Sequence, residues 1–230
     1  MGDGIMVGIA VYFQERAYEW MKEKAKEQKV LSEAEQKRLE RFEQITEEMQ
    51  KQGYTRHDLR IRMNDAFRFS IGLLVVLLAV GYGLYCFVHR SLNLTSLNGL
   101  LVVIIMLALI VIHELIHGVC WSIFTPHHFK DVAFGILKSS MTPYCTCQVL
   151  MKKPTYIFGA VMPLLVLGVI PMLVGVAIGN LNLLTIGILM ADAAAGDILI
   201  IHRVMGYKSD AKEQLYMDYP TEAGCVVFER

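Results

Sequence analysis

The sequence predicts an all-α polytopic membrane protein with four transmembrane helices, an N-terminal cytoplasmic helical hairpin and a small β-hairpin in the loop after the second span. Three observations predict this class. Hydrophobic residues make up 54% of the 230 residues, above the ~45–50% of ordinary soluble domains. Of the 22 basic residues, 13 lie in residues 14–68. Downstream, four apolar runs are long enough, at about 1.5 Å per residue, to cross about 30 Å of hydrocarbon.

The chain divides into three expected parts: a cytoplasmic helical extension (1–68), a four-span core (69–204) and a cytoplasmic tail (205–230). In the extension, the apolar run from Ile5 follows an acidic residue and lacks a basic region before it. It therefore predicts an amphipathic helix and not a signal peptide. Ser32 followed by Glu35 is a capping-box signature for a second helix, which we expect to end near Gly53.

The four predicted spans differ from their connections in basic charge. They cover 69–88, 100–119, 156–179 and 181–204. With both termini in the cytoplasm, 21 of the 22 Lys and Arg residues lie inside and only Arg90 lies outside. Because cytoplasmic loops are enriched in Lys and Arg, this asymmetry predicts an integral membrane protein with both termini cytoplasmic. It also argues against a soluble metallopeptidase with a deeply buried core.

The connection at 120–155 is longer than an ordinary helix–helix loop, and long loops are often functional. Residues 131–137 and 144–151 are rich in β-branched and aromatic residues, and a turn-forming segment at 138–143 separates them. This pattern predicts a β-hairpin on the cytoplasmic side of the membrane.

Charge and cysteine content exclude several classes. The formal net charge is +0, which excludes the basic surface expected of a nucleic-acid binder. The apolar spans make the lipid bilayer and proteins within it the expected partners. The five cysteines form an odd set in a chain too large for a disulfide-stapled miniprotein, and we expect reduced thiols. A single Cys145-x-Cys147 pair is expected to be core or surface thiols, and His127-His128 a solvated loop pair.

The second span ends in an HExxH motif, His113-Glu114-Leu115-Ile116-His117. Residues four apart on an α-helix lie about 40° apart around its axis, so both imidazoles project from one face and can hold one metal ion. Imidazole is a common zinc ligand. The motif therefore predicts a Zn²⁺ site held by His113 and His117, with Glu114 as the general base that takes a proton from the attacking water.

A catalytic zinc needs a third protein ligand. The acidic residues inside the predicted spans are Glu114, Asp192 and Asp197. Asp197 lies about 9 Å along its span from the cytoplasmic end, a depth similar to that of the two histidines. Asp192 lies deeper and about 140° away around the helix axis, so both aspartates face one ion only if residues 193–196 unwind. We favour Asp197 as the ligand and Asp192 as a hydrogen-bonding neighbour or part of a water path.

These motifs resemble the site-2 protease clan of intramembrane zinc metalloproteases. The HExxH motif is joined by the run 143–147, by Pro163, by Gly196-Asp197 and by the run 218–221. Together they resemble more closely a bacterial family of small zincin peptidases, over roughly residues 70–225. In the clan the third ligand lies in a Leu-Asp-Gly motif, whereas here the order is Gly196-Asp197.

The resemblance implies a zinc-dependent endopeptidase of a bacterial cytoplasmic membrane. It would hydrolyse a peptide bond in or near a transmembrane segment of a membrane protein substrate, and an edge strand of the hairpin would hold that segment extended. The alternative is a zinc-binding membrane scaffold or sensor without peptidase activity. Glu114 beside both predicted ligands favours catalysis, because a structural site needs no base.

Overall fold

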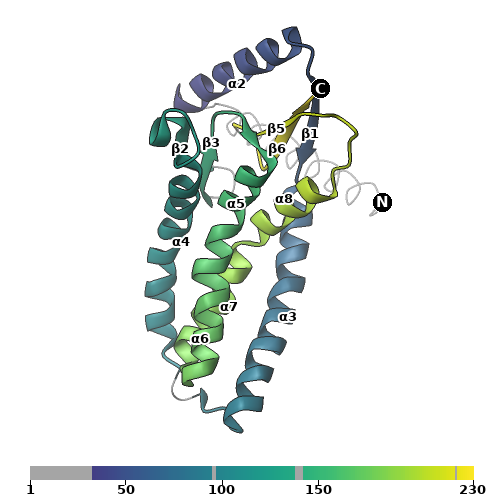
Figure 1. Ribbon diagram of the computed structural model, residues 1–230. Helices are drawn as coiled ribbons and strands as arrows, with labels where there is room; N and C mark the ends of the chain where they lie inside the picture. The colour runs from purple at the N-terminus through teal and green to yellow at the C-terminus, as the bar shows by residue number, and fades with distance from the viewer. Residues whose placement is uncertain (1–32, 95–96, 138–141, 221) are drawn as a thin grey trace, which may run out of the picture.

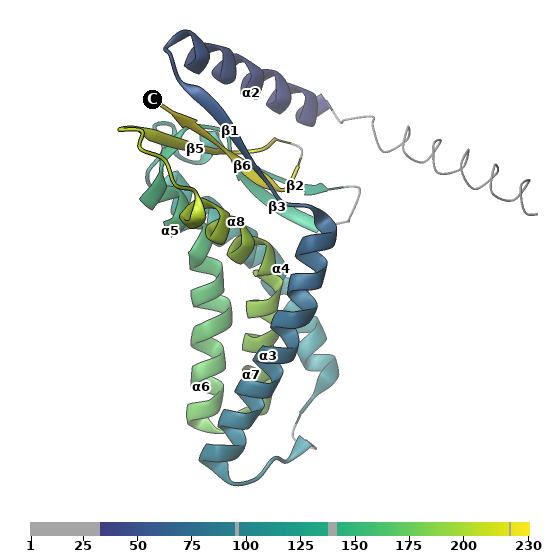
Figure 2. The ribbon, with the colours of Figure 1, turned by 90° about the vertical axis from the view of Figure 1, so that its right-hand side faces the viewer.

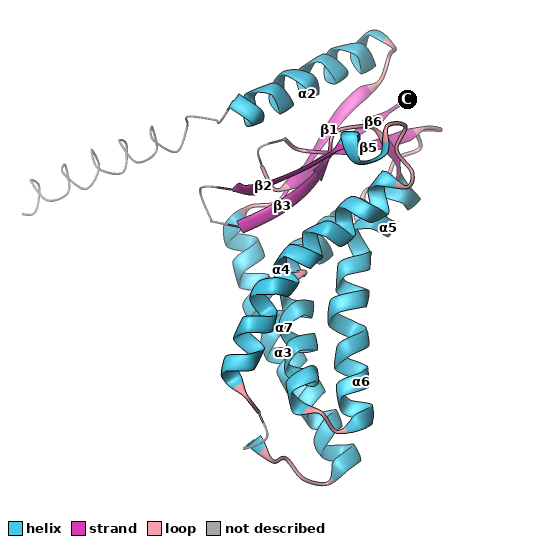
Figure 3. Ribbon diagram, turned by 90° about the vertical axis from the view of Figure 1, so that its left-hand side faces the viewer, coloured by secondary structure: helices cyan, strands magenta, loops and turns pink. Residues whose placement is uncertain are grey.

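The computed structural model describes residues 33–94, 97–137, 142–220 and 222–230. The protein is mostly helical, with antiparallel strands gathered at one end of a helix bundle (Figure 1; Figure 3). Helix α2 (Glu33–Lys51) begins one residue after the predicted cap at Ser32. The first helix predicted for the N-terminal hairpin lies outside the described residues.

Among the described residues, three helices are long and apolar enough to cross a membrane. They are α3 (Met63–His89), α4 (Gly99–Ser122) and a continuous helix formed by α5 (Lys153–Pro163), the π-helical turn η3 (Leu164–Val169) and α6 (Ile170–Ile178). Helix α4 begins where the Asn98 side chain accepts a hydrogen bond from the backbone N–H of Leu101, a standard N-cap. Length and composition are therefore compatible with an integral membrane protein.

The predicted fourth span is bent. Helix α7 (Leu181–Ala193) and helix α8 (Ala195–Gly206) meet at Ala194 at an angle of 48°. Only together, as one broken span, are they long and apolar enough to cross a membrane. The span predicted over 181–204 therefore consists of two helices, and the break lies within 193–196, the segment considered for unwinding. The break falls among small residues, where Gly196 lowers helix propensity and little side-chain surface is available to hold the helix straight.

A four-stranded antiparallel sheet corrects the prediction of an all-α protein with one hairpin. Its order is β1-β6-β5-β4, from strands β1 (Thr55–Arg60), β4 (Met151–Lys152), β5 (Gln214–Asp218) and β6 (Gly224–Glu229). Residues 214–229, expected to be a tail, thus form its centre. The charged segment of β1 has no apolar alternation, and it becomes a strand by pairing at the edge with β6, where Thr55 lies opposite Glu229.

The sheet is covered on both faces because successive side chains of a strand point to opposite sides. Met217 and Phe228 pack with Phe42 of α2. Tyr216 and Val227 pack on the opposite face with residues of the helix bundle. Figure 2 shows the resulting order of layers, with the sheet between α2 and the helices. The core at this end of the molecule is therefore shared by the bundle and both ends of the described chain.

The predicted hairpin is present as β2 (Val132–Leu137) and β3 (Thr142–Cys147), preceded by the 3₁₀ turn η2 (His128–Asp131). Strand β3 ends earlier than the predicted 151, and Phe134 pairs with Cys145. The hairpin lies against α4, where a Cβ at Gly118 would collide with the Phe134 ring. This contact places β3 beside the turns of α4 that carry the HExxH motif.

Candidate metal centre

Helix α4 presents both motif histidines on one face. The Nε2 atoms of His113 and His117 lie 3.2 Å apart, and the residues are 6% and 4% exposed. This proximity follows from their separation of four residues. Two nitrogen donors are thus aimed at the same point inside the protein.

Asp197 completes the group from the first turn of α8. Its Oδ2 lies 3.1 Å from His113 Nε2, and its Oδ1 lies 3.4 Å from His117 Nε2. One ligand atom from each of the three residues lies within 4.8 Å of the others. Because α8 starts anew after the bend at Ala194, Asp197 approaches α4 at a helix end.

The ring of His117 is held from its other side. Its Nδ1 lies 2.9 Å from the carbonyl oxygen of Gly159 on α5, and we assign the proton to Nδ1, which donates this hydrogen bond. The lone pair of the neutral ring is then on Nε2, directed at Asp197 and His113. A backbone carbonyl of this kind is a common partner of metal-binding histidines.

The donor set fits a zinc ion. Two imidazole nitrogens and a carboxylate oxygen are typical zinc ligands, and catalytic zinc sites have three protein ligands with a further position open. Moreover, the Nε2 atoms of the two histidines and both carboxylate oxygens of Asp197 lie close together. A cation bound between them would neutralise the negative charge of the carboxylate. His113 Nδ1 is buried without a hydrogen-bond partner in the described part of the chain. The contacts that orient this ring are therefore those of its Nε2 with Asp197 and His117.

Glu114 lines the same cavity as the three candidate ligands. The cavity has a volume of about 480 Å³ and is also lined by β3, by the start of α3 and by the segment after β5. The backbone N–H of Cys145 on β3 donates a hydrogen bond to the Glu114 carboxylate. The residue expected to act as base is therefore next to the candidate metal ligands and open to a molecule in the cavity.

Asp192 lies away from this group. Its two carboxylate oxygens accept hydrogen bonds from the Ser70 hydroxyl of α3, at 3.2 Å and 3.0 Å. It lines the cavity from the last turn of α7. The bend at Ala194 leaves the two aspartates with different partners.

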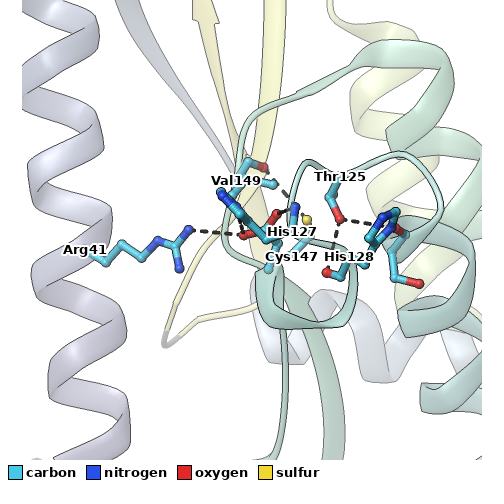
Figure 4. Close-up of polar contacts among 8 residues, drawn as sticks. Arg41, Thr125, His127, His128, Cys147 and Val149 are labelled. Carbon is cyan, nitrogen blue, oxygen red and sulfur yellow. Dashed lines mark hydrogen bonds and ion pairs between the residues drawn. The ribbon is translucent and has the colours of Figure 1, made fainter.

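The loop histidines lie elsewhere, in the segment after α4 (Figure 4). The Nδ1 atoms of His127 and His128 are 3.3 Å from Asp131 Oδ1 and 2.9 Å from the Ser122 carbonyl oxygen, respectively. Burial raises the pKa of the Cys145 thiol, and it raises that of Cys147 to about 12. Neither cysteine belongs to the candidate metal-binding group found among the described residues.

Sequence reasoning assigned no role to the groups that surround His117, although Asp218 opens the run 218–221 that carries part of the family resemblance. Trp121, one helical turn after His117, stacks on its ring with centroids 5.2 Å apart. Asp218 accepts hydrogen bonds from the Tyr156 hydroxyl at 2.6 Å and from the Cys147 backbone N–H at 2.9 Å. A carboxylate in the otherwise uncharged strand β5 was the signal available for Asp218, whereas no sequence pattern identifies a backbone carbonyl such as that of Gly159.

Comparison with known proteins supports a zinc enzyme. Residues 106–212 match the model of a family described as "putative zincin peptidase". Comparisons with curated proteins and with solved structures found no match. The matched segment includes the HExxH motif, which is typical of zincins, and Asp197, and it ends before β5. The similarity suggests a zinc-dependent peptidase, that is, a metalloprotease.

Proposed function

We propose that the protein is a zinc-dependent endopeptidase that cleaves membrane protein substrates in or near a transmembrane segment. One observation carries the proposal. His113, His117 and Asp197 converge beside Glu114, in a cavity between helices that are long and apolar enough to cross a membrane. A carboxylate next to the ligand set, but not part of it, is what peptide hydrolysis needs and a structural zinc site does not.

The chain's own residues divide the chemical work. His113, His117 and Asp197 would hold Zn²⁺, which when bound polarises a carbonyl group and lowers the pKa of water. Glu114 would accept a proton from the attacking water and deliver it to the leaving nitrogen. The cavity walls from α3, α5 and β3 would limit the access of bulk water and orient the scissile bond.

The substrate would have to be extended at the cleavage point, because the peptide bonds of a helix are shielded by their own hydrogen bonds. Strand β3 has one edge paired with β2 and the other toward the cavity. On that edge the N–H of Cys145 is bonded to Glu114 and the N–H of Cys147 to Asp218. A substrate strand that pairs here would take the Cys145 N–H and leave Glu114 free to act on water.

The test compares wild type with Glu114→Gln, which removes the proton acceptor but no ligand. We expect zinc content to stay near one per chain and turnover to fall at least ~10²-fold. Glu222→Gln is the matched control, because Glu222 lines the same cavity but pairs with Arg60 at 3.2 Å. Comparison of the membrane proteomes of cells carrying each variant identifies candidate substrates as proteins that stay uncleaved only with Glu114→Gln. Their cleavage rates are then measured with the purified wild type and variants.

Two outcomes would contradict the proposal. Cleavage by Glu114→Gln at the wild-type rate would exclude Glu114 as the base. Stoichiometric zinc in the wild type, with no membrane protein that differs between wild type and Glu114→Gln, would instead favour a zinc-binding scaffold or sensor.

A further inference from the structure

A column of four stacked rings leads from the metal centre into the sheet. His117 stacks on Trp121 at 5.2 Å, Trp121 on Tyr156 at 5.9 Å, and Tyr156 on Tyr216 at 6.0 Å, with interplanar angles of 17°, 22° and 28°. The three aromatic rings beyond His117 are at most 4% exposed. A buried ring in such a stack cannot turn without moving its neighbours, so the column restrains the plane of the His117 ring.

Asp218 lies beside the far end of this column. It is two residues after Tyr216 on β5 and therefore projects from the same face of the sheet. Its Oδ1 accepts a hydrogen bond from the Tyr156 hydroxyl, and its Oδ2 accepts one from the Cys147 backbone N–H. Burial raises its pKa to about 6. This carboxylate lies outside the candidate ligand group, although it lines the same cavity.

The two hydrogen bonds reach two elements that touch the metal centre. Tyr156 lies one helical turn before Gly159 on α5, and the Gly159 carbonyl accepts the hydrogen bond from His117. Cys147 lies two residues after Cys145 on β3, and the Cys145 N–H donates to Glu114. One side chain thus connects the element that orients a ligand with the element that orients the base.

We propose that Asp218 is a positioning residue of the metal centre, which holds α5 through Tyr156 and β3 through Cys147 so that His117 and Glu114 keep their orientations. The proposal rests on the proposed function. It also makes the strand pair β5–β6 part of the working site, although both strands lie outside the residues matched by the zincin family. Hydrogen bonding, and not negative charge, is the property of Asp218 that matters.

The test uses the full chain in detergent, with Trp20→Phe so that Trp121, the second of the 2 tryptophans, reports zinc binding at His117 by its fluorescence. Asp218→Ala and Tyr156→Phe should each lower zinc affinity and kcat about 10- to 100-fold, with KM nearly unchanged. Asp218→Asn should retain most of both, because the amide oxygen still accepts from Cys147 and the amide N–H can donate to the Tyr156 hydroxyl. Tyr54→Phe is the matched control, since its hydroxyl donates to Glu213 at 2.5 Å and Tyr54 lies outside both the ring column and the cavity.

If Asp218→Ala and Tyr156→Phe had the same zinc affinity and kcat as Tyr54→Phe, the positioning role would be overturned and the proposed function would stay intact. If Asp218→Asn lost as much zinc affinity and kcat as Asp218→Ala, the hydrogen-bonding mechanism would be overturned. A wild type that binds zinc but cleaves nothing would contradict the proposed function alone, because the zinc affinities of the variants still decide the role of Asp218. A wild type without zinc affinity would overturn both.

Discussion

At the residue scale, the candidate metal centre depends on which carboxylate of the bent helix faces the histidines. Asp197 contacts both rings, whereas Asp192 is bonded to Ser70 on another helix. The two residues are close in sequence and both line the cavity, so they form a natural pair for comparison.

We expect Asp197→Ala to lose most of the bound zinc and all cleavage, because a third protein ligand is removed. Asp192→Asn should keep zinc near one per chain, since the amide oxygen still accepts from Ser70. Elemental analysis of the purified variants measures both. Zinc lost from the Asp192 variant and kept by the Asp197 variant would reverse the assignment.

Asp218 gives a prediction about pH at the same scale. Burial raises its pKa in the folded protein to about 6, above the ordinary value of 3.8, so the folded state binds this proton more tightly than the unfolded state. The contribution of Asp218 to stability is therefore full below about pH 4 and is lost as the pH rises through about 6, by at most about 3 kcal/mol.

Thermal unfolding of wild type and Asp218→Asn across this pH range isolates the effect, because all other groups titrate in both proteins. The Tm of the wild type relative to the variant should fall as the pH rises from about 4 to about 7. A difference in Tm that does not change with pH would mean that Asp218 titrates alike in the folded and unfolded states.

At the scale of elements, the site depends on how closely α4 and α5 approach. A Cβ at Gly159 would collide with the Trp121 indole, which donates a hydrogen bond from Nε1 to the Tyr156 carbonyl at 3.2 Å. Glycine at this position lets the two helices pack with the indole between them, and it brings the Gly159 carbonyl to His117.

Gly159→Ala should therefore lower the free energy of unfolding by about 1–3 kcal/mol, as overpacking usually does, and weaken zinc binding. Gly72→Ala in α3 is the control, because a Cβ there meets nothing within 4 Å and alanine favours the helix. Thermal unfolding and zinc titration compare the two. Equal Tm and zinc affinity for both variants would show that the contact is not needed.

At the scale of the whole molecule, the sheet ties together three segments that are separated by the apolar helices. Strand β1 precedes α3 and pairs with β6 near the C-terminus, while β4 lies between α4 and α5 and pairs with β5. Residues joined in one sheet lie on one side of a membrane. If the apolar helices cross a membrane, we therefore predict an even number of crossings between these segments, and their excess of Lys and Arg predicts the cytoplasmic side.

Membrane-impermeant thiol labelling in intact cells tests this topology. Cys147 and Cys225 are 0% exposed, so introduced cysteines are needed. Ser91→Cys, in the exposed connection between α3 and α4, should react from outside. Lys212→Cys, exposed before β5, should react only after the membrane is permeabilised. The reverse pattern would invert the predicted orientation.

Features that depend on residues close together in the chain could be predicted from the sequence alone. The spacing of His113 and His117 places their rings together because the period of a helix is local. The apolar runs and the hairpin predicted at 131–151 follow from patterns of similar range, although the second strand ends at Cys147. The partners of these rings are distant in sequence, since Asp197 lies 84 residues after His113 and Gly159 lies 42 residues after His117. Asp218 likewise lies 62 residues after its partner Tyr156. These contacts could not be predicted from the sequence, because they depend on the break at Ala194, on the close packing of α4 against α5 and on strand pairing between distant segments. The charged strand β1 is the clearest case, since its residues form a strand only where β6 offers an edge.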